Sequence, residues 1–213
     1  FSSKNGSSHI QHTVFYDCFA NNAQSFFLSM HDGLQCNSIS DSTVLSCSKS
    51  PIKSGNNGFY LDSGKQVVNH LNSTNNHLYG ESTAGQFYGI CPTSISWCKF
   101  INHSTETSLL IFFGGPFGDY HITQTQFIDF TKQSKLWGAL STGRQATLLM
   151  ENCLIQRIKG VIFQSTGRHI KIVNCSLDKL DVDKGIKHWV LFHNVTKIPA
   201  THRPKKRNQK RNK

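Results

Sequence analysis

Residues 141–144, Ser-Thr-Gly-Arg, recur unchanged as residues 165–168, so the chain repeats itself at a distance of 24 residues. Each copy lies between short apolar runs and is followed by an Asn-Cys pair, which begins at Asn152 in one copy and at Asn174 in the other. A fixed period of about two dozen residues is typical of a solenoid, in which every repeat is one coil. The repeat therefore predicts a stacked architecture.

The apolar runs predict strands. They are short, rich in β-branched and aromatic residues, and bounded by Gly, Asn, Ser and Asp, and no window carries a sustained helical stripe. Looser copies of the unit extend upstream to Tyr16 and downstream to Val195. The leucine scaffold of leucine-rich repeats, which share this period, is absent. We expect an all-β fold, a right-handed single-stranded parallel β-helix of about seven to eight coils, in which neighbouring strands stack about 4.8 Å apart.

Composition divides the chain into three parts. Residues 1–9 are a polar leader, residues 10–198 the β-helix domain and residues 199–213 a basic tail that we expect to be disordered. Charged residues make up only 16% of the chain, which is typical of a solenoid coated with Ser, Thr and Asn. No apolar run is long enough to cross a membrane, so we expect no transmembrane segment.

Five of the seven cysteines fall at equivalent places in their repeats, with Thr125 at that place in another repeat. The five are Cys18, Cys47, Cys98, Cys153 and Cys175. Stacking of the coils predicts that these side chains form one column that points inward at a tight corner. The simpler interpretation is a buried column of small residues, since free cysteine packs as a small apolar group. The alternative is a disulfide, for which Cys153 and Cys175 lie on neighbouring coils. No Cys-x-x-Cys is present, so we predict no metal site.

These motifs resemble a known family. The Asn-Cys-x-aliphatic pieces at 152–155 and 174–177, and the Cys-x-Phe piece at 98–100, are similar to polymorphic outer-membrane-protein type repeats. Such repeats occur in chlamydial surface autotransporters, and this chain is more similar to the corresponding surface proteins of trichomonad parasites. The usual Gly-Gly-Ala-Ile piece is eroded here to 58–60 or 137–139. The resemblance covers most of residues 10–198 and implies a surface-displayed right-handed β-helix with a role in adhesion, without catalytic residues or a cofactor.

The tail is basic throughout. Its cationic side chains are Arg203, Lys205, Lys206, Arg207, Lys210, Arg211 and Lys213, which supply seven of the eleven net positive charges. One interpretation is a solvated tail, and the others are a salt-sensitive contact with an acidic polymer or a nuclear-import-like signal. No aromatic residue is interleaved with the cations, so we expect no specific recognition of nucleic acid.

Other candidate contacts are scattered along the chain. Asn72, Asn102 and Asn194 begin the sequons that we interpret as glycosylation sites. Arg144 and Arg168 stand in the repeated turn, where stacking predicts either an anion or ligand contact or two solvated arginines. The sequons favour a secretory route, whereas unpaired cysteines favour an intracellular one.

Taken together, these features favour a non-enzymatic β-solenoid at the cell surface or secreted. We expect it to bind a protein or a glycan through the face that carries the loops 48–57 and 114–120. One alternative is an intracellular or cytoskeletal structural protein that docks on an acidic polymer or filament through its tail. Another is a polysaccharide-active enzyme, which would need two carboxylates in one groove, with Asp119 and Asp129 as the first to examine.

Overall fold

The structure of the protein is a computed structural model. The structure describes residues 2–3, 7–18, 25–31, 36–47, 57–62, 64–78, 82–88, 92–105, 109–114, 118–132, 138–143, 145–165, 169–182 and 189–199. The regular elements in these ranges are β-strands. Over the same ranges, no helix has the length and apolar character that a membrane span requires.

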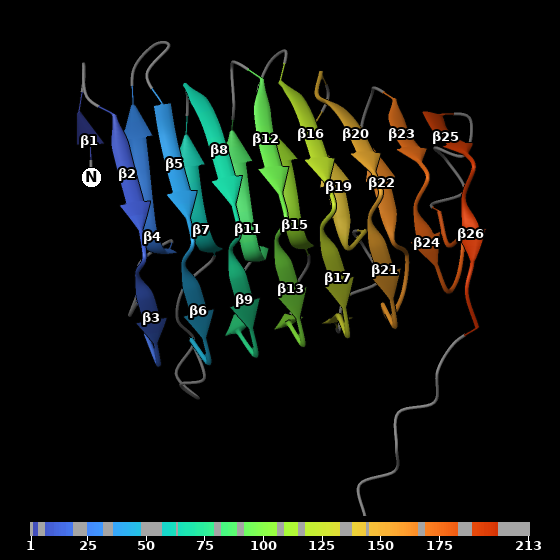
Figure 1. The fold of residues 1–213 in the computed structure, drawn as a ribbon, viewed down its shortest axis with the longest axis horizontal. Helices are drawn as coiled ribbons and strands as arrows, with labels where there is room; N and C mark the ends of the chain where they lie inside the picture. Colours follow the sequence, from blue (N-terminus) through green and yellow to red (C-terminus); the bar gives the residue numbers. More distant parts are fainter. Residues whose placement is uncertain are drawn as a thin grey trace, which may run out of the picture.

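The strands form four parallel sheets, which we name A to D (Figure 1). Sheet A contains β1 (Ser2–Ser3), β4 (Ser25–His31), β7 (Asn57–Asp62), β11 (Ser82–Tyr88), β15 (Leu109–Gly114), β19 (Leu140–Thr142) and β22 (Phe163–Ser165). Sheet B contains β2 (Ser8–Gln11), β5 (Cys36–Ser40), β8 (Lys65–Asn69), β12 (Thr93–Ser96), β16 (Asp119–Thr123), β20 (Thr147–Glu151), β23 (Ile170–Val173) and β25 (Val190–His193).

Sheet C follows sheet B along the chain and sheet D is short. Sheet C contains β3 (Val14–Tyr16), β6 (Thr43–Leu45), β9 (Asn72–Thr74), β13 (Lys99–Ile101), β17 (Gln126–Ile128), β21 (Leu154–Gln156), β24 (Ser176–Leu177) and β26 (Thr196–Lys197). Sheet D contains β10 (His77–Leu78), β14 (Ser104–Thr105) and β18 (Thr131–Lys132). Strands β1 and β2 begin inside residues 1–9, which the sequence predicts as a polar leader, because strand pairing uses the backbone of polar residues as well.

Successive strands of each sheet come from successive turns and pair in parallel, and the colours of Figure 1 run in order along the stack. The predicted all-β parallel solenoid is therefore confirmed. Its period is not constant: Ile39 pairs with Val68, 29 positions on, whereas Ile172 pairs with Phe192, 20 positions on.

The repeated Ser-Thr-Gly-Arg tetrapeptide lies one position out of structural register. Thr142 pairs with Ser165, and Leu140 pairs with Phe163. Leu140 and Phe163 are both fully buried. A slip of one residue would turn each side chain of a strand to the opposite face, so the inward apolar residues decide the pairing and the identical tetrapeptides do not.

Inward side chains of successive turns stack into apolar columns. In sheet B one column contains Ile39, Val68, Ile95, Ile122, Met150 and Ile172, each at most 1% exposed. In sheet C the rings of Phe100 and Phe127 stack with centroids 5.4 Å apart. Such same-face neighbours on paired strands stabilise the sheets and fill the interior.

Most turns bend sharply at two corners, and a residue with positive φ stands at each of these bends. The first corner, between sheets B and C, has His12, Asp41, His70, Trp97, Gln124, Asn152, Asn174 and Asn194 at φ of 47° to 56°. The second corner, after sheet C, has Asp17, Ser46, Asn75, Asn102, Asp129 and Arg157 at φ of 51° to 60°. Asn and Asp tolerate this left-handed conformation better than other side chains do, which explains the asparagine of the Asn-Cys motif.

The residue after each corner points inward, and in the first corner it is usually small and polar. Its backbone N–H donates to the side chain of the equivalent residue one turn later: Cys98 N–H to Thr125 Oγ1 at 3.3 Å, and Cys153 N–H to Cys175 Sγ at 3.3 Å. The accepting side chain itself donates to the carbonyl two residues before it, as Thr125 Oγ1 does to Thr123 O at 2.8 Å. Buried N–H groups of the bend thereby find acceptors.

The cysteines occupy both corners, so the predicted single column is wrong. Cys98, Cys153 and Cys175 stack with Thr125 in the first corner. Cys18 and Cys47 stack in the second corner. The prediction fails because both corners follow the same pattern, a left-handed residue before a small one, and local sequence does not distinguish them. All five side chains are free thiols, and Cys18 is the one that is only half-buried.

Thr125 offers a direct test of this hydrogen bonding. Thr125→Val keeps the volume of the side chain but removes the acceptor for the buried Cys98 N–H, so we expect a loss of about 1–3 kcal/mol in the free energy of unfolding. Thr125→Ser keeps the hydroxyl and is the control. Urea denaturation measures both variants, and a Val variant as stable as the Ser variant would contradict the role given to the hydroxyl.

The burial of His103 allows us to predict how the free energy of unfolding changes at acidic pH. His103 is 1% exposed in the second corner, and burial lowers its pKa from 6.5 to about 4. Its Nε2 lies 2.9 Å from Ser73 O, and its Nδ1 has no hydrogen-bond partner among the described residues. The unfolded chain binds the proton more tightly, so stability should fall by about 3 kcal/mol as the pH drops from 6.5 to about 4.

The matched variant is His103→Asn, because Asn76 fills the same position one turn earlier. Asparagine does not titrate, so the variant should lose stability less steeply between pH 6.5 and 4. Denaturation curves for both proteins across this range measure the two slopes. Parallel slopes would show that His103 does not set the response.

Candidate ligand-binding groove

Several sequence-predicted sites lie outside the described residues. These are the basic tail (203–213), Arg144 and Arg168, and residues 48–56 and 115–117 of the two predicted binding loops. The predicted glycosylation sites are described, and each is exposed. Asn72 lies on the outer face of sheet C, Asn102 in the second corner and Asn194 in the first corner.

The structure does not bring Asp119 and Asp129 together. Asp119 begins β16 in sheet B and accepts a hydrogen bond from the Thr147 hydroxyl on β20. Asp129 lies in the second corner, where its two carboxylate oxygens accept bonds from Arg157 Nε at 2.9 Å and Nη2 at 3.1 Å. The arginine neutralises this carboxylate, and the two acids lie at different sites along the turn.

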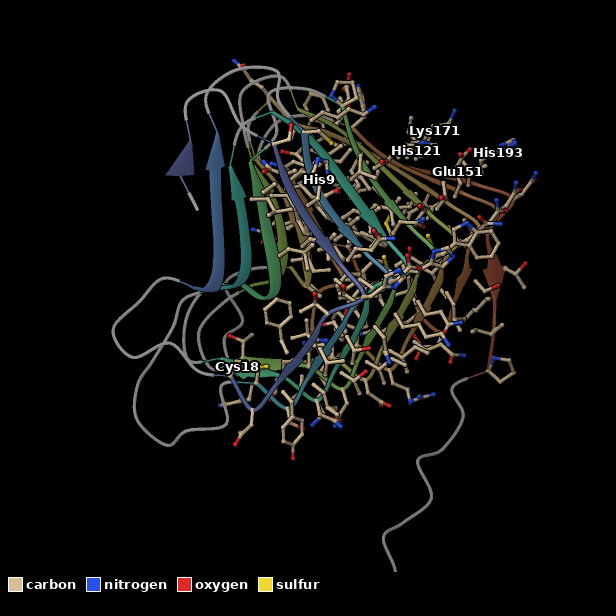
Figure 2. The ribbon with its side chains drawn as sticks, turned by 60° about the vertical axis from the view of Figure 1, so that its left-hand side comes forward. His9, Cys18, His121, Glu151, Lys171 and His193 are labelled. Carbon is tan, nitrogen blue, oxygen red and sulfur yellow. The ribbon has the colours of Figure 1, made fainter. Side chains whose placement is uncertain are left out.

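The outer face of sheet B carries a row of titratable side chains, of which His121, Glu151, Lys171 and His193 are labelled in Figure 2. His121 Nε2 lies 2.7 Å from Glu151 Oε2 on the next strand, and Lys171 and His193 follow on β23 and β25. The two paired side chains are 47% and 35% exposed. Water screens a pair of this kind, so it contributes little to stability.

Beside this strip, the same face has a hollow of about 470 Å³ whose lining includes Lys65, Ser94, Asp119 and His121. Its side chains mix both charges with an apolar residue, Leu149. The hollow holds a single carboxylate, which Thr147 already hydrogen-bonds.

A second groove, of about 280 Å³, follows the first corner along the stack. It is lined by Gln124, Thr125, Gln126, Asn152, Cys153, Leu154, Asn174 and Ser176. Three of these, Gln124, Asn152 and Asn174, are the left-handed corner residues of successive turns. None of the eight side chains carries a formal charge. The groove therefore presents neutral amides and a hydroxyl at the spacing of the strands, about 4.8 Å.

The groove amides differ from those of the second corner in their bonding. In the second corner, Asn102 Nδ2 donates to Asn75 Oδ1 at 2.6 Å, so these amides satisfy one another. The side-chain amides of Gln124, Asn152 and Asn174 make no hydrogen bond to another described residue. Their donors and acceptors point to solvent and are available to a ligand.

Trp97 stands one turn before Gln124 in the same corner and is 53% exposed. Its indole stacks on the ring of His70, with centroids 6.3 Å apart and planes 24° from parallel. His70 in turn lies 3.4 Å from Asp41. These contacts hold an aromatic face in the corner, next to the row of amides.

Sequence reasoning missed this groove. The available signal is the polar residue before each inward small residue, at Gln124, Asn152 and Asn174. That pattern occurs in both corners. Only the side-chain hydrogen bonds show that the amides of the second corner bond one another, whereas those of the first corner do not.

Over the residues that the structure describes, no group of three or more His, Cys, Asp or Glu side chains is arranged to hold a metal ion. Comparisons of the chain with protein-family models, with curated proteins and with solved structures found no match.

Proposed function

We propose that the protein is a non-enzymatic, surface-displayed binding module that holds a neutral carbohydrate chain in the first-corner groove. The observation that carries this proposal is the row of unbonded amides of Gln124, Asn152 and Asn174, one turn after the half-exposed Trp97. The separate positions of Asp119 and Asp129 are a further reason to propose binding rather than catalysis.

The chemistry of the groove matches that of a sugar. Amide groups donate and accept at once, as sugar hydroxyls also do, so each amide can bond a hydroxyl in either direction. An aromatic face is apolar and flat, and it packs against the C–H face of a sugar ring. A lining without charge gives no preference for an acidic polymer. Since the amides recur turn after turn, an extended chain parallel to the solenoid axis would meet the same contacts repeatedly.

Display at a surface and the finer details of the fold belong to the same proposal. The resemblance to polymorphic outer-membrane-protein type repeats and the exposed sequons at Asn72, Asn102 and Asn194 support a secreted or surface location. We propose a right-handed helix of seven to eight coils, a number that the two eight-stranded sheets support. Docking of the 203–213 tail on an acidic polymer is a separate hypothesis that rests on sequence alone.

The test is binding of neutral and acidic oligosaccharides to the full chain produced without N-glycosylation, since Asn174 begins a sequon inside the groove. We expect a neutral oligosaccharide to bind, with an affinity that salt barely changes because no charge takes part. Calorimetric titration measures the affinity. Preference for acidic sugars, or loss of binding when 203–213 is deleted, would contradict the proposal.

Variants at the corner positions locate the site. Trp97→Asn removes the ring, and Asn152→Gly removes an amide, while both new residues tolerate the positive φ found there. Each should weaken binding at least about tenfold, the size of a lost contact of 1.4 kcal/mol. Asn102→Gly makes the same change in the second corner and should leave the affinity unchanged. Equal effects of Asn152→Gly and Asn102→Gly would place the ligand elsewhere.

A further inference from the structure

Cys18 and Cys47 face each other across the first two turns of the solenoid. Their strands β3 and β6 pair Tyr16 with Leu45, and the two cysteines stand two positions further along. The Sγ of Cys47 lies 3.7 Å from Phe15 O, on the strand that leads to Cys18. The thiol of Cys47 therefore points toward the turn that holds Cys18.

We propose that Cys18 and Cys47 are a redox pair that closes into a disulfide bond and links the first turn to the second. This inference is independent of the proposed carbohydrate site. Neighbouring parallel strands lie about 4.8 Å apart, and a disulfide accepts Cα atoms roughly 4.4–6.8 Å apart. Closure also requires the two Cβ atoms to lie about 3.5–4.5 Å apart.

The two thiols differ in their exposure to solvent. They follow strands β3 and β6, which pair in parallel. Cys18 is half-buried, whereas Cys47 is fully buried. A thiol oxidant can therefore reach Cys18 more readily than it can reach Cys47.

Cys153 and Cys175 are the matched pair inside the same chain. They also lie on neighbouring turns, but they are only 3% and 1% exposed. Strands β21 and β24 each have a neighbour on both sides. We therefore expect this pair, the disulfide alternative raised by the sequence, to remain thiols.

The reaction with a small disulfide such as oxidised glutathione proceeds in two balanced steps. The Cys18 thiolate attacks one sulfur of glutathione disulfide, that S–S bond breaks, and one glutathione thiolate leaves. Cys47 then loses its proton and attacks Cys18 Sγ, which expels the second glutathione. The two protein thiols are oxidised to one disulfide, and the oxidant is reduced to two thiols.

The second step should depend strongly on pH. Burial raises the pKa of the Cys47 thiol to about 11, and only its thiolate attacks. The Cys18–glutathione adduct should therefore resolve about tenfold faster for each pH unit gained below that pKa. Adduct lifetimes at pH 7 and pH 8 measure this dependence.

The experiment oxidises the full chain, carrying Cys91→Ser, with oxidised glutathione and maps the native protein without reduction. Cys91 is replaced because it lies outside the described residues. Cleavage before Asp17, Asp32 and Asp41 puts Cys18, Cys36 and Cys47 on separate peptides, and cleavage after Arg157 separates Cys153 from Cys175. We expect a Cys18–Cys47 link and unreacted Cys98, Cys153 and Cys175.

Two controls make the result decisive. Cys36 pairs with Lys65 and not with a cysteine, so it should keep a glutathione adduct. Cys47→Ser should leave a lasting adduct on Cys18. Oxidation should also slow amide exchange in Val14–Tyr16 of the parent and not of Cys47→Ser. Lasting adducts on Cys18 of the parent, no reaction at Cys18, or equal closure of Cys153 with Cys175 would overturn the proposal.

Discussion

The structure depends on how the chain satisfies its backbone at the two corners of every turn. At most corners a residue with positive φ bends the chain, and the next side chain points into the core. In the first corner, buried N–H groups find their acceptors on small polar side chains of the following turn, as Cys98 N–H does on Thr125 Oγ1. An unsatisfied buried N–H would cost as much as a hydrogen bond contributes. The inward position of the first corner therefore favours Ser, Thr and Cys, although Leu71 and Val195 also occupy it, for a reason that packing alone does not give.

The same bend has different consequences at the two corners. In the second corner the outward side chains bond one another: Asn102 with Asn75, and Arg157 with Asp129. In the first corner the amides around Asn152 face a groove. One corner thus serves the stability of the stack, while the other combines stability on its inner side with an open polar surface on its outer side. A repeated local geometry can carry two roles because its inward and outward side chains vary independently.

Cysteines that follow similar bends differ in their exposure to solvent. Cys18 and Cys175 both follow a left-handed residue and both donate to the carbonyl two positions earlier, at 3.6 Å and 3.2 Å. Cys175 lies in the first corner and is fully buried, whereas Cys18 lies in the second corner and is half-buried. Exposure, rather than residue type, decides which thiols can react.

The sequence by itself determined the all-β solenoid, because the alternation of apolar and polar residues, the Gly-bounded runs and the Asn-Cys bend are local features. It also marked the inward cysteines. Only the tertiary structure decided the rest. The pairing follows Leu140 and Phe163 rather than the identical Ser-Thr-Gly-Arg segments, and the cysteines divide between two corners. The groove of Gln124, Asn152 and Asn174 likewise arises from turns about two dozen residues apart. These features depend on register between turns of unequal length, and register is set by which side chains fit the shared core, a property that no single repeat contains.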